Sequence, residues 1–489
     1  MDNIQQKTLQ DLEFFTVLDQ LSLRCNTELG KEKILTVVPL NSKESILNSL
    51  GQTSEYLSSY TNDNRVPNHG FDAIHQELKL LKIENTSLEI TGFRKIGNIC
   101  ITVTTHLKFF KKFKDYYPLL YGASDTIELN SEIPTQIDMV IDRFGEIKDN
   151  ASDDLRTIRQ EINFVKGKIN QSFGSALNTY NASEFLDEIR ESVVENRRVL
   201  AVKAMYRKKV KGAVMGSSKT GSIVYIEPEA TLKYSRELNN LEFDETEEIK
   251  KILKYLTDHI RTYAPLLRIY QEYLTDMDIT ASKAKYAMEM NAVMPEISTD
   301  KKMHLRDAFH PLLYLSNKRK NEKTYPQTIS LYPENRIIVI SGPNAGGKSI
   351  TLKTIGLLQL MVQSGMLIPV HERSTICLFD KILTDIGDNQ SIENHLSTYS
   401  YRLKNMNSFL RKCNESTLFL IDEFGTGSDP ELGGALAETF LEVFYERGAY
   451  GVITTHYSNL KMLANELPEM TNANMLFDSS TLEPTYQLV

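Results

Sequence analysis

A short apolar strand that runs directly into a glycine-rich loop constrains this chain more than any other feature. Residues 336–340 read RIIVI and are followed by SGPNAGGKS, which fits G-x-x-x-x-G-K-[S/T] at every fixed position. Glycines suit such a loop because backbone N–H groups must turn inward onto phosphate oxygens. Apolar residues then recur at helical spacing up to Gly365. Strand, loop and helix together predict a phosphate-binding site in an α/β domain.

The loop supplies the predicted contacts to ATP. These residues are Gly342, Pro343, Asn344, Ala345, Gly346, Gly347, Lys348 and Ser349. The side chain of Lys348 is expected to reach the β- and γ-phosphates, and the hydroxyl of Ser349 is expected to hold Mg²⁺.

Two later strands end in residues that suit the same chemistry. Residues 417–421 read TLFLI, a continuous apolar run typical of a buried parallel strand, and end in Asp422 and Glu423. Asp422 fits a Mg²⁺ ligand, and Glu423 fits the group that orients or deprotonates the attacking water. A further strand over 450–455 ends in His456, which is either a γ-phosphate sensor or an ordinary surface or core histidine.

Composition limits the class of protein. A chain of 489 residues is longer than the length at which a single hydrophobic core stops growing, so two or three domains are expected. No stretch of 18 or more apolar residues occurs, and the N-terminus has no signal-peptide pattern, which predicts a cytoplasmic protein without membrane contact. Four scattered cysteines indicate reduced, buried thiols. The net charge of −8 means that any nucleic-acid binding must come from local basic segments.

The rest of the chain predicts a second kind of region. Residues 5–120 have a helical pattern, and residues 152–195 read as a long charged helix capped by Ser152. A small β insertion is predicted at about 196–228, followed by a helix over 230–264 that Pro265 bends or ends. We therefore expect a multidomain fold: a mainly α-helical core and lever over 1–298, and an α/β P-loop ATPase domain over 299–489.

Two basic segments are candidates for nucleic-acid contact. Residues 108–114 read KFFKKFK, and residues 207–211 read RKKVK at the presumed end of the lever. The alternative for the first segment is a solvated helix face, and for the second an ordinary charged hairpin.

Beyond these patterns, three motifs resemble one family closely. They are residues 342–349, DEFGTG at 422–427 and TTHY at 454–457, which resemble the MutS branch of the ABC-type ATPases. DIGDNQSI at 385–392 and LSTYS at 396–400 look like the bacterial MutS-II paralogues, with Tyr399 where Phe is usual. Weaker similarity upstream extends the resemblance over most of the chain.

The resemblance implies further site residues. Ser397 and Thr398 would form the signature that contacts ATP held by the other subunit, so a homodimer is implied. Residues near Tyr325 would stack on adenine, although an aromatic ring there could equally pack under the sheet.

The resemblance also implies two alternative functions. The first is a DNA-binding ATPase that acts on branched, recombining or mismatched DNA and suppresses recombination. The second is a ribosome-associated ATPase that splits or rescues stalled ribosomes through contacts with ribosomal RNA. An ABC transporter subunit would need a Leu-Ser-Gly-Gly-Gln signature, which the sequence lacks.

Two features of the relatives are not recognised in this sequence. The N-terminal mismatch-reading domain with its Phe-x-Glu wedge is not found, and the triplet at residues 243–245 falls inside the predicted lever helix. MutS-II proteins typically continue into a C-terminal nuclease-like Smr domain, whereas this sequence stops at Val489. Nuclease activity is therefore not expected of these residues.

Overall fold

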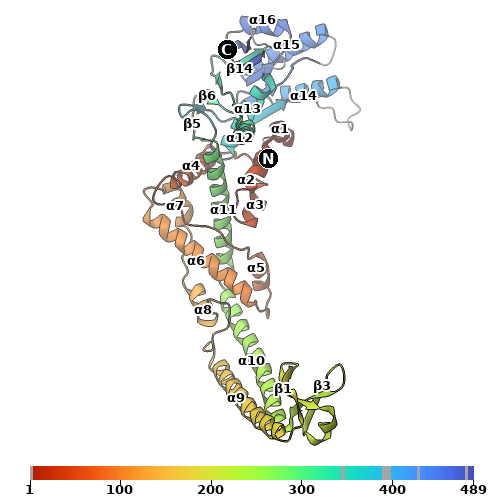
Figure 1. Ribbon diagram of the computed structural model, residues 1–489. Helices are drawn as coiled ribbons and strands as arrows, with labels where there is room; N and C mark the ends of the chain where they lie inside the picture. The colour runs from red at the N-terminus through yellow and green to blue at the C-terminus, as the bar shows by residue number, and fades with distance from the viewer. Residues whose placement is uncertain (1–3, 343–346, 388–397, 427–429, 479–482, 489) are drawn as a thin grey trace. The chain divides into compact units, whose positions relative to one another are not determined.

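The computed structural model describes residues 4–342, 347–387, 398–426, 430–478 and 483–488. The chain has a multidomain fold with helices and several β-sheets, and it divides into two compact units (Figure 1). The first unit contains residues 1–73, 102–128 and 271–489, and the second contains residues 74–101 and 129–270. The predicted boundary at residue 298 divides the helical core and lever from the ATPase domain, and it remains a prediction.

Helices dominate the N-terminal part of the chain. They are α1 (Gln6–Asp11), α2 (Phe14–Ser22), α3 (Glu28–Ile34), α4 (Lys43–Ser59), α5 (His75–Leu81), α6 (Ile90–Lys112), α7 (Pro118–Asp125), α8 (Glu132–Val140), α9 (Asp153–Ala182), α10 (Glu229–Arg261) and α11 (Ala264–Glu289). The helical pattern predicted for residues 5–120 is therefore confirmed.

A six-stranded sheet organises the C-terminal part of the first unit. Its strands, in spatial order, are β10 (Lys381–Asp385), β11 (Thr417–Ile421), β12 (Tyr450–Thr454), β8 (Ile337–Ser341), β13 (Met470–Asp478) and β14 (Glu483–Leu488). The first five run parallel, and β14 pairs antiparallel with β13. The flanking helices are α13 (Lys348–Gln363), α14 (Thr398–Lys412), α15 (Pro430–Glu446) and α16 (Ser458–Glu466).

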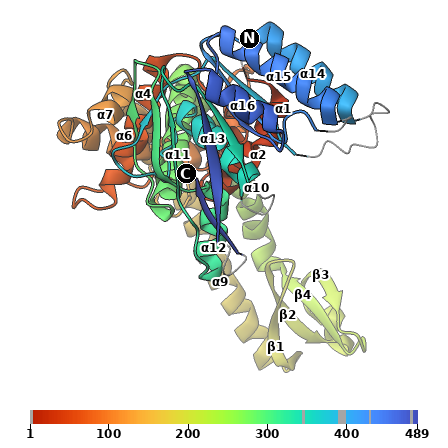
Figure 2. The ribbon, with the colours of Figure 1, turned by 90° about the horizontal axis from the view of Figure 1, so that it is seen from above.

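The two faces of this sheet are covered by different helices, because successive strand residues point to opposite sides. In β8, Ile338 and Ile340 pack in the core cluster that contains α13. Ile337 and Val339 pack with apolar residues of α14, α15 and α16, which lie together in Figure 2. All five residues of β8 are buried, as expected for a central strand of a parallel sheet.

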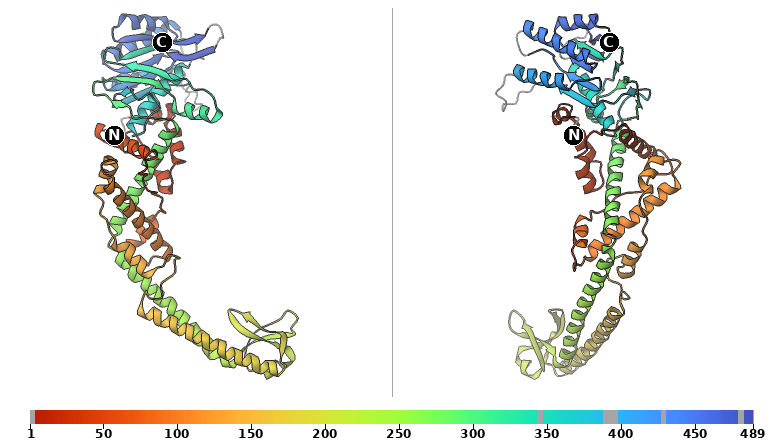
Figure 3. Two further views of the ribbon diagram at one scale, coloured as in Figure 1. Left: turned by 60° about the vertical axis from the view of Figure 1, so that its left-hand side comes forward. Right: turned by 180° about the vertical axis from the view of Figure 1, so that it is seen from behind.

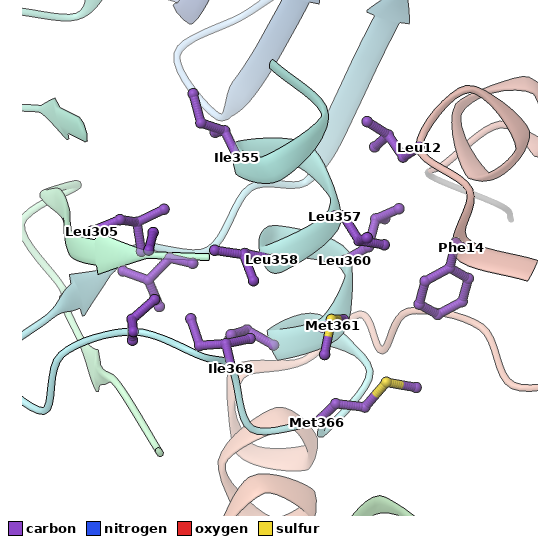
Figure 4. Packing of buried hydrophobic residues seen from close by; sticks show 14 of the residues in the cluster. Leu12, Phe14, Leu305, Ile355, Leu357, Leu358, Leu360, Met361, Met366 and Ile368 are labelled. Carbon is purple, nitrogen blue, oxygen red and sulfur yellow. The ribbon is translucent and has the colours of Figure 1, made fainter. Parts of the chain in front are cut away.

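The N-terminal helices complete the core of the same unit. The hydroxyl of Thr8 in α1 donates to the carbonyl of Ile382 in β10 at 3.1 Å. Leu12 and Phe14 are fully buried and lie beside α13, on the side opposite Leu305 (Figure 4). Every residue from position 354 to 363 of α13 is buried, so this helix is enclosed on all sides.

Replacement of Gly356 tests this packing. A Cβ at this position would lie 2.5 Å from Cδ2 of Leu12 and 2.7 Å from Cδ1 of Leu420. We expect Gly356→Ala to lower the free energy of unfolding by about 1–2 kcal/mol, because overpacking outweighs the gain in helix propensity. Urea unfolding measures this change.

Gly122 in α7 is the matched control, because a Cβ there would meet no atom within 4 Å. Gly122→Ala should therefore raise the free energy of unfolding by up to about 1 kcal/mol. Equal shifts for the two variants would contradict the packing described for Gly356.

A second, four-stranded sheet lies in the same unit. Its order is β5 (Glu296–Ile297), β9 (Thr375–Ile376), β6 (Met303–Ala308) and β7 (Gln327–Leu331). Between β6 and β7 lies α12 (Pro311–Lys320), whose N-cap is His310. The imidazole Nδ1 of His310 accepts the N–H of Leu313 at 3.4 Å, and the residue is 7% exposed.

The buried cap makes stability depend on pH. Burial lowers the pKa of His310 to about 4, from an ordinary value of 6.5. Between these values the unfolded chain binds a proton that the folded chain excludes, so the free energy of unfolding falls as the pH falls. We expect His310 to account for a loss of about 2 kcal/mol between pH 7 and pH 5.

Asparagine also caps helices but does not titrate. The pH dependence of urea unfolding should therefore be weaker in His310→Asn than in the wild type. Identical profiles for the two proteins would show that His310 does not cause the loss.

In the second unit, α9 and α10 lie side by side, with a small sheet at one end of the pair (Figure 3). The predicted cap is confirmed, since the N–H of Leu155 donates to Oγ of Ser152 at 3.1 Å. Arg159 of α9 forms an ion pair with Glu245 of α10 at 2.7 Å. An ion pair between polar side chains therefore joins these two long charged helices.

The small sheet has the order β1 (Leu186–Val194), β2 (Arg197–Lys203), β4 (Ile223–Pro228) and β3 (Gly212–Ser217). The strand signals at 199–202 and 222–226 are confirmed by β2 and β4. The helix predicted over 152–195 is wrong in its last part, because α9 ends at Ala182 and 186–194 form β1. The many charged residues of β1 interrupt the alternation of apolar and polar residues by which a strand is recognised in a sequence. Antiparallel pairing with β2 determines its conformation.

The effect of Pro265 is confirmed. The helix α10 ends at Arg261, and α11 begins at Ala264 with the proline in its first turn. Proline fits the start of a helix because the N–H that it lacks has no partner there.

The thiols also agree with the sequence prediction. All four cysteines are free and buried. Burial raises the pKa of Cys100, Cys377 and Cys413 to about 12, so these groups stay protonated at neutral pH. Over the described part of the chain, no helix is both long and apolar enough to cross a lipid bilayer.

Candidate nucleotide-binding site

The glycine-rich loop joins the central strand β8 to the buried helix α13. Gly342 has φ +126° and Gly347 has φ +91°, values that a residue with a Cβ rarely adopts. A Cβ on Gly342 would also lie 3.3 Å from Met475 of β13. The predicted contacts Pro343, Asn344, Ala345 and Gly346 lie outside the described residues.

Lys348 begins α13 and is buried, with 3% of its surface exposed. Its Nζ donates to the carbonyl of Gly342 at 2.6 Å and lies 3.5 Å from Nε2 of His456. Burial lowers the pKa of Lys348, and the carboxylates of Asp422 and Glu423 oppose that shift. Residues from three distant segments of the sequence therefore meet around the amine of Lys348.

Asp422 follows β11 directly and is held from the neighbouring strand. Its Oδ1 accepts a hydrogen bond from Oγ1 of Thr454 in β12 at 2.6 Å, and the residue is 7% exposed. Its N–H donates to the carbonyl of Asp385 at the end of β10, at 2.9 Å. These bonds fix an oriented carboxylate at the C-terminal edge of the parallel sheet, where ligands of open α/β sheets bind.

Glu423 occupies a strained turn beside Asp422. Its φ of +48° is unusual for a residue other than glycine. The hydroxyl of Thr454 accepts the N–H of Glu423 at 2.7 Å, so one threonine holds both acidic residues. Strained residues of this kind persist where the surroundings fix them, and they concentrate at functional sites.

His456 reaches the same edge from β12. Because Thr454 lies opposite Ile340 in the parallel register, the residues that follow β12 and β8 emerge together. The imidazole of His456 is exposed and lies near the amine of Lys348. A role for this histidine as a γ-phosphate sensor remains a prediction.

The side chains present fit a magnesium nucleotide. Mg²⁺ prefers oxygen ligands, and the carboxylate of Asp422 and the exposed hydroxyl of Ser349 are of that kind. The N-terminus of α13 and the ammonium of Lys348 suit negatively charged phosphates.

Three predicted contacts, Ser397, Thr398 and Tyr325, lie in other segments of the sequence. Ser397 lies outside the described residues, and Thr398 begins α14 with a side chain that is not described. Tyr325 lies between α12 and β7, is 41% exposed and has Nζ of Lys323 4.7 Å from its ring centroid. Roles for these three residues remain predictions.

Sequence reasoning missed the part played by Thr454. The sequence predicts Thr454 only as part of a strand and of the TTHY motif, but its hydroxyl links Asp422 and Glu423. The sequence signal that could have indicated this role is the hydroxyl of Thr454 near the end of one predicted strand. The strand expected beside it ends in the carboxylates of Asp422 and Glu423.

The second unit carries one of the two basic segments. Arg207, Lys208 and Lys209 are exposed in the short helix η1 (Ala204–Lys209). The region 186–228 contains nine Lys and Arg against five Asp and Glu, a net charge of +4 in a chain of net charge −8. Here Phe185 stacks on Tyr206, and Lys209 lies over both rings.

In the other basic segment, residues 108–114, aromatic side chains pack against the protein itself. Phe110 is fully buried, and Phe109 stacks on Tyr117 with centroids 5.9 Å apart. The side chains of Lys111, Lys112 and Lys114 remain exposed, as on an ordinary solvated helix face.

Comparison with known proteins adds an independent observation. Residues 338–487 match the family model for MutS domain V. The chain is 35% identical over 495 residues to the protein named endonuclease MutS2 from Leuconostoc mesenteroides, with 99% of this chain and 60% of the relative covered. The endonuclease MutS2 proteins of Caldicellulosiruptor bescii and Ligilactobacillus salivarius are 34% and 35% identical, with 99% of this chain and 61% of each relative covered.

The chain spans about 60% of the length of the curated relatives that it matches. The domain match begins in β8 and includes the glycine-rich loop, both acidic residues and His456. The predicted resemblance is confirmed: nearly the whole of this chain is similar to MutS2 proteins, and residues 338–487 match MutS domain V.

Proposed function

We propose that this chain is an ATP-dependent DNA-binding protein that hydrolyses ATP in a composite site formed by two copies of the chain. Its target is branched, recombining or mismatched DNA, and its effect is to suppress recombination. The observation that carries the ATPase assignment is the meeting of Lys348, Asp422, Glu423 and His456 at the C-terminal edge of the parallel sheet.

Each of these residues has a role that follows from its position. Lys348 turns from the carbonyl of Gly342 to the β- and γ-phosphates, and Ser349 and Asp422 hold Mg²⁺. Glu423 orients and deprotonates the attacking water, and His456 contacts the γ-phosphate. Bound Mg²⁺ supplies positive charge that offsets the charge developing on the phosphates.

The second copy completes the site through α14. Ser397 and Thr398 contact the ATP held by the other copy. Each copy then supplies the catalytic carboxylate for one nucleotide and the signature for the other. The ATP cycle opens and closes the dimer around its target.

The proposed DNA contact is the basic sheet of the second unit. Three observations support it: the net charge of +4 over residues 186–228, the exposed cations of η1 and the name of the relatives, endonuclease. A phosphate backbone binds clusters of Lys and Arg with release of counterions, so the contact is sensitive to salt.

Neutralising the cluster tests this assignment. We expect Arg207→Gln, Lys208→Gln and Lys209→Gln together to weaken binding to a four-way DNA junction. The slope of log K against log salt should fall by about 2 to 3, because up to three phosphate contacts are lost. Fluorescence anisotropy over a series of salt concentrations measures both quantities.

The matched control neutralises Lys111, Lys112 and Lys114, whose exposed side chains carry the same charge. That variant should bind the junction as the wild type does. Equal losses in both variants would contradict a specific contact by η1. Binding to ribosomes that depends on ATP, without retention of junction DNA, would replace the DNA assignment by the ribosome-associated function.

A further inference from the structure

The carbonyl oxygen of Glu423 is held by three donors. The N–H of Thr426 lies 3.2 Å away, its hydroxyl 2.8 Å away, and Nη1 of Arg402 3.1 Å away. This peptide group directly follows the strained φ of +48°, so its orientation determines where the Glu423 side chain points. The carboxylate is therefore positioned through the backbone.

Arg402 is the charged member of this group. It lies on α14, and its side chain is 14% exposed. The same Nη1 donates to Oγ1 of Thr426 at 2.6 Å, so the guanidinium holds both ends of the turn. Hydrogen bonds from a charged donor are stronger than those between neutral groups.

The other side of the guanidinium faces Asp385. Its Nε lies 4.0 Å from Oδ2 of this carboxylate, which is 4% exposed and accepts Nδ2 of Asn405 at 3.2 Å. Asp385 ends β10, next to β11, and its carbonyl accepts the N–H of Asp422. Arg402 therefore lies between the end of one sheet strand and the turn that follows the next.

We propose that Arg402 is a positioning residue for ATP hydrolysis, which fixes the Glu423 turn and couples it to α14. The proposal rests on the function proposed above, in which Glu423 acts on the attacking water. Because α14 begins at Thr398, one helical turn before Arg402, engagement of this helix by a second copy is transmitted to the catalytic carboxylate. Arg402 acts through the backbone of Glu423 and does not touch the nucleotide.

A positioning role predicts a specific kinetic signature. Loss of the guanidinium leaves Lys348 and the glycine-rich loop intact, so ATP binds as before. The attacking water is misaligned, and kcat falls on the order of 10- to 100-fold in Arg402→Gln. The Kd for ATP and the KM should stay within about twofold of the wild-type values.

Three further variants separate positioning from a general loss of structure. Arg402→Lys keeps the charge but can make fewer of these bonds, so its kcat should lie between those of the wild type and Arg402→Gln. Thr426→Val removes the hydroxyl that links Arg402 to the turn. Lys404→Gln removes an exposed cation from the same helix and should leave kcat unchanged.

The double variant Arg402→Gln, Thr426→Val is the decisive member of the set. Because both side chains act on the same carbonyl, the two effects on kcat should not multiply, and the double variant should resemble the slower single variant. Effects that multiply would overturn the proposal. So would a wild-type kcat in Arg402→Gln, or a rise in the Kd for ATP that accounts for the whole loss.

Failure of this inference can be distinguished from failure of the proposed function. If the wild type hydrolyses ATP and Glu423→Gln does not, the site is catalytic, and the Arg402 variants test positioning alone. If Glu423→Gln keeps the wild-type rate, the proposed role of Glu423 is wrong. The proposed coupling between α14 and Glu423 through Arg402 is then wrong as well.

Discussion

Replacing Glu423 with Gln should reduce kcat for ATP hydrolysis about 100-fold or more while ATP still binds. The amide keeps the size of the side chain and the backbone bonds to Thr454 and Thr426, so the turn is preserved. What is lost is the negative charge that orients the attacking water and accepts its proton. Steady-state hydrolysis and equilibrium binding of a fluorescent ATP analogue, measured on the same preparation, separate the two effects.

Glu431 is a suitable control, since it lies in the first turn of the nearby helix α15 and is exposed. Glu431→Gln should hydrolyse ATP at nearly the wild-type rate. A Glu423→Gln variant that turned over normally would assign the water-activating role to another group. Loss of nucleotide binding in that variant would show instead that the carboxylate supports the fold of the site.

The second large effect is expected at Lys348. Replacement by Ala removes the ammonium that lies beside Gly342 and His456, and with it the charge that the phosphates need. Both binding and hydrolysis should fail: we expect ATP affinity to drop about 10- to 100-fold, with turnover lost in parallel. Isothermal titration with ATP and Mg²⁺ measures the affinity directly.

Lys353 lies further along the same helix and provides the matched control. It forms an ion pair with Glu13 at 3.1 Å at a partly exposed position, a contact worth at most about 1 kcal/mol. Lys353→Ala should keep the affinity for ATP. An unchanged affinity in Lys348→Ala would contradict the assignment of the glycine-rich loop.

The elements that carry the site could be predicted because their signals are local. The strand over 337–341, the glycines that follow it and the helix from Lys348 are adjacent in the sequence, so their pattern is visible without any long-range information. The strand before Asp422 could also be predicted locally, because its five residues form a continuous run and all of them are buried. Parallel strand order then brings the strand ends to one edge.

Other parts of the fold depend on distant residues. No local pattern shows that Leu12 fills the space left by Gly356, or that Thr8 bonds to Ile382, because these partners are hundreds of positions apart. The strand 186–194 was predicted as helix because its charged sequence has no clear alternation, and its pairing partner determines its conformation.

The same limit applied within the site. The motif residues could be named one by one, but the bonds that orient them could not. No sequence pattern marks Thr454 or Arg402 as a residue that positions Glu423. The fold shows that both side chains bond to the backbone of Glu423. Positioning residues of this kind are therefore the part of a site that sequence motifs describe least.

The most direct test of the central claim is the steady-state rate of ATP hydrolysis by the purified wild-type chain, with and without Mg²⁺, beside Lys348→Ala and Glu423→Gln. We predict turnover that requires Mg²⁺ and is lost in both variants, with nucleotide still bound by Glu423→Gln. A wild-type chain that binds no nucleotide, or a rate that both variants retain, would contradict the assignment of this sheet edge as an ATPase site.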